Sequence, residues 1–192
     1  MYAKSIEKRE LILEGAKNVI LRKGFSAASM KDITVECGIS RGGLYFYFSS
    51  VEEIFTEILK TRKRTTKELV EMFIEQSGDF STLLDMYFDY QKERLQHMER
   101  SLLSALIEFG FTHKEPEDRE LIEEQYLSTK EILLEIMSFG KAGGELRGDP
   151  ELLADQVLYL IEGMSIKAMT AGIPAETVNH QFELLKKQLV YS

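Results

Sequence analysis

One short stretch of the chain gathers a long cation, two glycines and two tyrosines: Arg41, Gly42, Gly43, Tyr45 and Tyr47. A guanidinium matches the two hydrogen-bond acceptors of a guanine edge, and tyrosine hydroxyls can donate to phosphate oxygens. Glycines permit the close approach of a backbone to a bound molecule. These residue types and their spacing indicate contact with nucleic acid.

Two short predicted helices joined by a tight turn would position these residues. Ser29 gives a start signal for the first helix, with Asp32 three residues later as in a capping box. Gly38 can take a positive φ and so ends that helix, and Ser40 offers its hydroxyl to the first free amides of the second. This is a helix-turn-helix pattern, in which the first residues of the second helix face the bases of the major groove.

The apolar residues of both helices fall on a separate face. Met30, Ile33 and Cys37 are predicted to point inward from the first helix, at helical spacing. Leu44 and Phe48 are four residues apart and are predicted to do the same from the second. The spacing therefore separates a core face from a contact face.

Eight residues of this region are predicted to bind DNA. Arg41 is the only long side chain at the start of the second helix, so we assign it direct contact with bases. The tyrosines, Ser29 and Lys31 are assigned phosphate contacts, which add affinity with little sequence information. The full set is Ser29, Lys31, Ser40, Arg41, Gly42, Gly43, Tyr45 and Tyr47.

A longer pattern surrounds these residues and spans roughly residues 8–55. It consists of Gly24-Phe25, Ser29-Met30-Lys31-Asp32-Ile33, Gly38-Ile39-Ser40-Arg41-Gly42, Leu44-Tyr45-Phe46-Tyr47-Phe48 and Ser50. This combined pattern resembles the N-terminal domain of the TetR family of bacterial transcriptional repressors. The resemblance implies a homodimer that binds a palindromic double-stranded DNA operator and a small-molecule effector.

The chain departs from the family pattern at three positions. Thr34 and Cys37 stand where the family often has Ala, which indicates small buried positions that Thr and Cys can fill. Val51 stands where the family often has a lysine that contacts a phosphate, so we expect that contact to be absent.

The rest of the chain has strong helix signals and almost no strand signals. The sequence predicts an all-α fold of about nine helices, with a three-helix DNA-binding head at residues 1–50. A long helix would join the head to a helical effector-binding and dimerisation domain at residues 51–192. The predicted helices outside the helix-turn-helix are 5–23, 51–76, 80–98, 100–111, 116–140, 150–171 and 175–190.

The net charge of −8 is unevenly distributed. Residues 1–64 hold 12 Lys or Arg against 8 Asp or Glu, whereas residues 65–192 hold 12 against 24. A positive N-terminal part can lie on phosphates while an acidic remainder faces away, because salt screens charges beyond about 10 Å. The single cysteine and the lack of a signal peptide or an apolar membrane span predict a cytoplasmic protein with no membrane partner.

Adaptable and aromatic side chains are dense in the middle helices. Their composition alone favours a packed core, whereas the resemblance implies an effector site for a hydrophobic or amphipathic molecule. The predicted effector-binding residues are Met72, Phe73, Met86, Tyr87, Tyr90, Glu108, Phe109, Phe111, His113 and Tyr126.

The last two predicted helices are the candidates for dimerisation. The 150–171 segment is apolar on more than one face, so it needs cover on two sides, and we expect a symmetry mate to cover one of them. The alternative is a monomer in which these helices are simply central. The predicted interface residues are Leu153, Val157, Leu160, Met164, Phe182, Leu185 and Leu189.

Other chemistry has little support. The histidines are far apart and show no metal-ligand spacing, no nucleophile motif is present, and we expect no cofactor, no metal site and no enzyme activity. The sequence therefore predicts a TetR-like regulator, most simply a homodimeric repressor released by its effector. The alternative is a helical ligand-binding or protein-interaction module with little DNA-binding activity.

Overall fold

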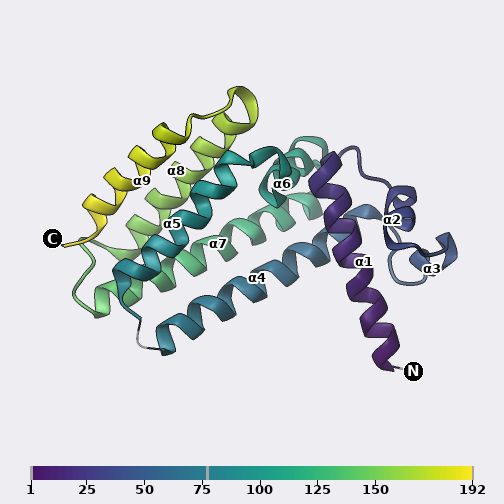
Figure 1. The fold of residues 1–192 in the computed structure, drawn as a ribbon, viewed down its shortest axis with the longest axis horizontal. Helices are drawn as coiled ribbons and strands as arrows, with labels where there is room; N and C mark the ends of the chain where they lie inside the picture. Colours follow the sequence, from purple (N-terminus) through teal and green to yellow (C-terminus); the bar gives the residue numbers. More distant parts are fainter. Residues whose placement is uncertain (1, 77, 192) are drawn as a thin grey trace. The chain divides into compact units, whose positions relative to one another are not determined.

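A computed structural model of the chain describes residues 2–76 and 78–191. This part of the chain contains nine α-helices and one 3₁₀ turn (Figure 1). Their bounds are α1 Tyr2–Lys23, α2 Met30–Cys37, α3 Arg41–Tyr45, α4 Val51–Glu75, α5 Phe80–Gln96, the 3₁₀ turn Met98–Arg100, α6 Leu102–Thr112, α7 Pro116–Ala142, α8 Pro150–Ala171 and α9 Ala175–Leu189.

The all-α prediction is confirmed, and the predicted helices differ from the observed ones only by a few residues at their ends. Proline and its preceding cap explain the sharp starts. Pro150 is the first residue of α8, and the Asp149 carboxylate accepts the N–H groups of Glu151 and Leu152. Proline suits this position because the first N–H of a helix has no partner within the helix. Within residues 2–76 and 78–191, no helix is long and apolar enough to cross a membrane.

The chain divides into two compact units, which are discontinuous in sequence. Unit 1 comprises residues 1–62 and 99–122, and unit 2 comprises residues 63–98 and 123–192. Two of the three boundaries fall inside α4 and α7, so each of these helices contributes residues to both units, and the third falls in the 3₁₀ turn. These units do not test the predicted division of function between a DNA-binding head at residues 1–50 and an effector-binding and dimerisation domain at residues 51–192. That division remains a prediction.

Unit 1 holds a core built from α1, α2, α3, the first half of α4, and α6. Ile33 of α2, Leu44 of α3 and Phe55 of α4 are all fully buried in it. Ala105 and Phe109 of α6 join the same core, so this late helix belongs to the unit that contains the helix-turn-helix. The inward prediction for Ile33, Leu44 and Phe48 is confirmed.

The contact between α1 and α2 depends on a small residue at Gly15. A Cβ atom built there would lie 2.4 Å from the Cys37 Sγ, so an alanine would collide with the thiol. Cys37 is half-buried rather than fully enclosed, and burial raises the pKa of its thiol. Thr34 is also half-buried, and its hydroxyl donates to the Lys31 carbonyl at 2.7 Å.

Unit 2 is a bundle in which α8 and α9 lie beside α5, as Figure 1 shows. Phe80, Leu133, Val157 and Phe182, one each from α5, α7, α8 and α9, are buried together in its core. Gly140 lets α7 approach closely, because a Cβ there would lie 2.5 Å from the Phe80 ring. A short antiparallel bridge between Leu146 and Val190 fastens the end of α9 to the segment before α8.

Candidate nucleic-acid interface

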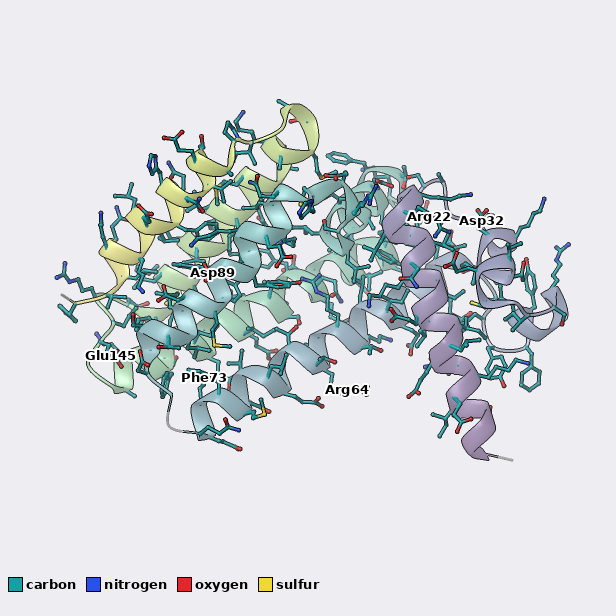
Figure 2. All side chains as sticks on the ribbon, viewed as in Figure 1. Arg22, Asp32, Arg64, Phe73, Asp89 and Glu145 are labelled. Atoms are coloured by element: carbon teal, nitrogen blue, oxygen red, sulfur yellow. The ribbon has the colours of Figure 1, made fainter. Side chains whose placement is uncertain are left out.

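The start of α2 is fixed by Ser29 and Asp32. The Ser29 hydroxyl accepts the Asp32 N–H at 3.2 Å and donates to the Asp32 carboxylate at 2.6 Å. Lys23 contacts the same carboxylate at 2.7 Å, and the bonds from Lys23 and Ser29 hold the pKa of Asp32 below its usual value. Figure 2 shows Asp32 next to Arg22 at the end of α1. The predicted cap is confirmed, although the carboxylate bonds to the hydroxyl of Ser29.

The turn between α2 and α3 has the predicted conformation. Gly38 has φ +63° and ψ +31°, and the N–H groups of Gly38 and Ile39 donate to Val35 and Thr34 carbonyls, which closes α2. Only the backbone angle requires glycine, because no atom lies within 4 Å of a built Cβ. The Ser40 hydroxyl then accepts the Gly43 N–H at 3.1 Å and starts α3.

Helix α3 presents different side chains on its different faces. Leu44 is buried within α3, and Phe48 is buried just beyond its end. Arg41 is exposed, and its guanidinium lies 5.3 Å from the centre of the Tyr45 ring, which stands one helical turn away. No atom lies within 4 Å of a Cβ built on Gly42, so the start of the helix is open.

The two tyrosines have different surroundings. Tyr45 is exposed, whereas Tyr47 is half-buried and its hydroxyl accepts a bond from the Ser5 hydroxyl at 3.4 Å. The Tyr47 ring also meets the ring of Phe46 edge-on, with centroids 5.1 Å apart. Phe46 itself is 80% exposed, although the motif gives no reason to separate it from buried Phe48.

Several cations lie near these residues, but they differ in their partners. Arg9, Arg22 and Lys23 each pair with a carboxylate, on Glu57, Glu36 and Asp32. The ion pairs formed by the described side chains include none with Lys8, Lys31 or Arg41. Lys8 was not among the predicted DNA-binding residues, because it belongs to α1 and not to the helix-turn-helix. In the structure its amine lies 3.9 Å from a Cβ built on Gly43. Three cations are thus available to phosphates.

Four of the predicted effector-binding residues lie in unit 1, and three of them, Glu108, Phe109 and His113, make side-chain contacts that position them there. Phe109 is buried and contacts the rings of Phe25 and Phe55, at centroid distances of 5.2 and 6.1 Å. The His113 ring stacks on Phe109 at 4.3 Å. Glu108 accepts the Ser26 N–H at 3.1 Å. These three residues therefore contact the segment that leads from α1 into the helix-turn-helix.

The other predicted effector-binding residues divide by exposure. Met72, Met86, Tyr90 and Phe111 are exposed, which leaves them outside both cores. Those that pack against the core of unit 2 are Phe73, Tyr87 and Tyr126.

Unit 2 also contains buried polar atoms that the sequence did not single out. Gln91 of α5 is 3% exposed, and its Oε1 has no hydrogen-bond partner among the described residues. The same holds for Nε2 of Gln125 in α7. Nearby in sequence, Tyr126 donates to the Tyr159 hydroxyl at 3.1 Å, and this bond raises the pKa of Tyr126. Among the described side chains, no group of His, Cys, Asp or Glu is placed to hold a metal ion.

Most of the predicted dimer-interface residues are already covered within the single chain. Val157, Met164, Phe182, Leu185 and Leu189 are buried in the core of unit 2, and Leu153 and Leu160 are half-buried against it. A side chain that is already fully buried within one subunit has no accessible surface left to contact a second subunit. The exposed apolar residues of α8 are instead Leu152, Tyr159 and Ile166, at 71%, 59% and 44%.

Comparisons with known proteins agree with this arrangement. Residues 12–58 match the family model of the bacterial regulatory proteins of the tetR family. The chain is 33% identical over 143 residues to YfiR, an uncharacterised helix-turn-helix-type transcriptional regulator of Bacillus subtilis, covering 73% of this chain and 69% of YfiR.

Solved structures share the fold over nearly the whole chain. A transcriptional regulator from Saccharomonospora viridis, in complex with choline, superposes with a TM-score of 0.77 at 21% identity, covering 97% of this chain and 99% of that one. FadR from Bacillus subtilis, in complex with stearoyl-CoA, does so with a TM-score of 0.70 at 21% identity, covering 93% and 98%. The helix-turn-helix, the family match and the extended similarity to YfiR together lead to one conclusion: this chain belongs to the tetR family of bacterial regulatory proteins and is a transcriptional regulator.

Proposed function

We propose that this regulator is a homodimeric repressor that binds a palindromic operator and is released by a small hydrophobic or amphipathic effector. DNA binding is assigned to residues 1–50, and effector binding and dimerisation to residues 51–192. The observation that carries the proposal is the start of α3, where Arg41 is exposed beside two glycines while Leu44 anchors the helix from the opposite face. Such a helix can enter a major groove without unpacking its core.

Base and phosphate contacts would be shared among the exposed residues of the head. Arg41 would donate to a guanine edge, while Tyr45, Tyr47, Ser29 and Lys31 would hold phosphates. Ser40 keeps the start of α3 in place through its bond to the Gly43 N–H, and Gly42 leaves room for the DNA backbone or a base edge. Lys8 adds a further cation beside this end of α3.

Dimerisation would use the exposed stripe of α8. Leu152, Tyr159 and Ile166 are spaced by seven residues and so share one face of the helix. Gly163 lies between them, and nothing stands within 4 Å of a Cβ built there, so a second helix could approach closely. The buried residues predicted from sequence would then support this surface from beneath. A two-fold dimer brings two heads to two half-sites of a palindrome.

Effector binding would take place in unit 2. The buried, unpartnered Oε1 of Gln91 and Nε2 of Gln125 support this, because buried polar atoms normally have partners and a ligand can supply them. Two regulators of the same fold were solved with choline, a small quaternary ammonium alcohol, and with stearoyl-CoA, which carries a long acyl chain. The effector would favour a head separation other than the roughly 34–36 Å between successive major grooves.

A retardation assay with the purified protein tests this function. Duplex fragments from the region upstream of its own gene are mixed with the protein at low and at physiological salt. One fragment should be retarded at nanomolar to micromolar protein, and titration with choline or acyl-CoA series should identify a compound that releases it. If no fragment is retarded even at low salt, the chain is better explained as a ligand-binding or protein-interaction module.

A further inference from the structure

Phe46 is the most exposed of the large apolar side chains in the part of the chain that the structure describes, at 80%. A single exposed apolar residue is common on protein surfaces and by itself needs no explanation. The position of Phe46 does need an explanation, because this residue directly follows α3 in unit 1.

The backbone places Phe46 on the same face as Gly42. Its φ of −67° and ψ of −29° are helical, and its N–H donates to the Gly42 carbonyl at 3.1 Å, so it continues the turn of α3. Residues four apart share one helix face, and on this face Gly42 contributes no side chain and has open space around it. The face therefore consists of an open backbone followed by one exposed phenyl ring.

One neighbouring ring, that of Tyr47, contacts Phe46. The Tyr47 ring meets it at an interplanar angle of 80°, and Tyr47 is itself half-buried and bonded to Ser5. The adjacent row of α3 is formed by Arg41 stacked on Tyr45. The exposed ring of Phe46 thus belongs to the same short helical segment as Arg41, and Lys8 lies against this segment at Gly43.

These surroundings indicate DNA as the occupant of this face. Free cations beside an apolar ring suit a polyanion that also carries apolar groups, and in the major groove the only apolar group on a base edge is the C5-methyl of thymine. We propose that Phe46 contacts a thymine methyl in each half-site, within about three base pairs of the guanine contacted by Arg41. The estimate of spacing follows from a helical rise of about 1.5 Å per residue against about 3.4 Å per base pair. This inference rests on the proposed DNA-binding function.

Replacing thymine by deoxyuridine tests the proposal, because the exchange removes only the methyl group. A preferred duplex is first selected from random DNA, and each thymine of one half-site is then exchanged in turn. Wild-type protein should lose about four-fold in affinity at one thymine, the effect expected for one methyl-sized group. Phe46→Ala should bind the parent duplex more weakly and show no loss at that thymine.

Leu11→Ala is the matched control, because Leu11 is an exposed apolar residue of the same unit, at 50%. It should keep the wild-type sensitivity to uracil, and thermal unfolding should show that both variants remain folded. The inference would be overturned if Phe46→Ala and wild type lost the same affinity on exchange of thymine for deoxyuridine. It would also be overturned if the wild type lost no affinity at any thymine. Either result would leave the proposed DNA binding intact. If the wild type binds no duplex at all, the proposed function fails and the inference fails with it.

Discussion

At the scale of single residues, the proposed function assigns base contacts and phosphate contacts to different residues of the head. Arg41 is held over Tyr45 rather than paired with a carboxylate, so its guanidinium keeps its donors for DNA. Tyr47 is more constrained, since its ring and hydroxyl both have neighbours within the protein. The contribution of each residue should therefore be visible in how its loss depends on DNA sequence.

Arg41→Ala should relax base preference. Loss of a bidentate contact to guanine costs about 1–3 kcal/mol, so affinity for the selected duplex should fall between about five-fold and about 150-fold. Affinity for random duplex should change far less. Fluorescence anisotropy titrations on both duplexes measure the ratio, and equal losses on the two would show that Arg41 only contacts phosphates.

Lys8→Ala should weaken binding to all sequences alike. One lost phosphate contact lowers the slope of log affinity against log salt by about one. Lys17→Ala is the matched control on the same helix, because Lys17 already pairs with Glu14 at 3.2 Å. A slope unchanged in Lys8→Ala, measured between low and physiological salt, would remove Lys8 from the interface.

At the scale of elements, the helix-turn-helix was predictable because its signals are local. Ser29, Gly38 and Ser40 act through hydrogen bonds or backbone angles only a few residues away. It was harder to predict which of the five aromatic and apolar residues 44–48 are buried, because hydrophobicity alone does not distinguish exposed Phe46 from buried Phe48. The faces of α3 and the turn that follows it decide which ring is buried.

Two glycine substitutions should separate folding from binding. Gly38→Ala places a Cβ at φ +63° and should destabilise unit 1 by about 1–2 kcal/mol. Gly42→Ala meets no atom within 4 Å and should stabilise α3 by about 0.5–1 kcal/mol, yet weaken DNA binding by filling the open face.

Thermal unfolding and DNA titration of both variants provide the comparison. Gly38→Ala should lower the melting temperature, whereas Gly42→Ala should raise it slightly and still bind DNA less tightly. Undiminished DNA affinity in Gly42→Ala would contradict the close approach assigned to this position.

At the scale of the whole molecule, sequence reasoning was limited by contacts between distant segments. Helix α6 was predicted as residues 100–111, but nothing local indicates that Ala105 and Phe109 join the core of unit 1. In α8, apolar residues occur around much of the helix, and only the fold distinguishes buried Val157 from exposed Tyr159. Helix positions were thus predictable, while their partners were not.

Ile166→Glu should weaken dimerisation if α8 forms the subunit contact. Ile166 is 44% exposed, and a buried, unpaired carboxylate in an interface is strongly unfavourable. Sedimentation at micromolar protein should show a shift from dimer towards monomer. Leu69→Glu is the control, because Leu69 is an exposed apolar residue of α4 outside the proposed stripe, and it should leave the dimer intact. A dimer of undiminished stability in Ile166→Glu would move the contact elsewhere.

The central claim is that two heads of one dimer contact two half-sites at a fixed spacing. Its most direct test inserts five base pairs between the half-sites of the selected operator, which places them on opposite sides of the double helix, about half a turn apart. Affinity should fall at least ten-fold, to about that of a duplex with one half-site scrambled. Equal affinity for the original and the lengthened operator would contradict the account.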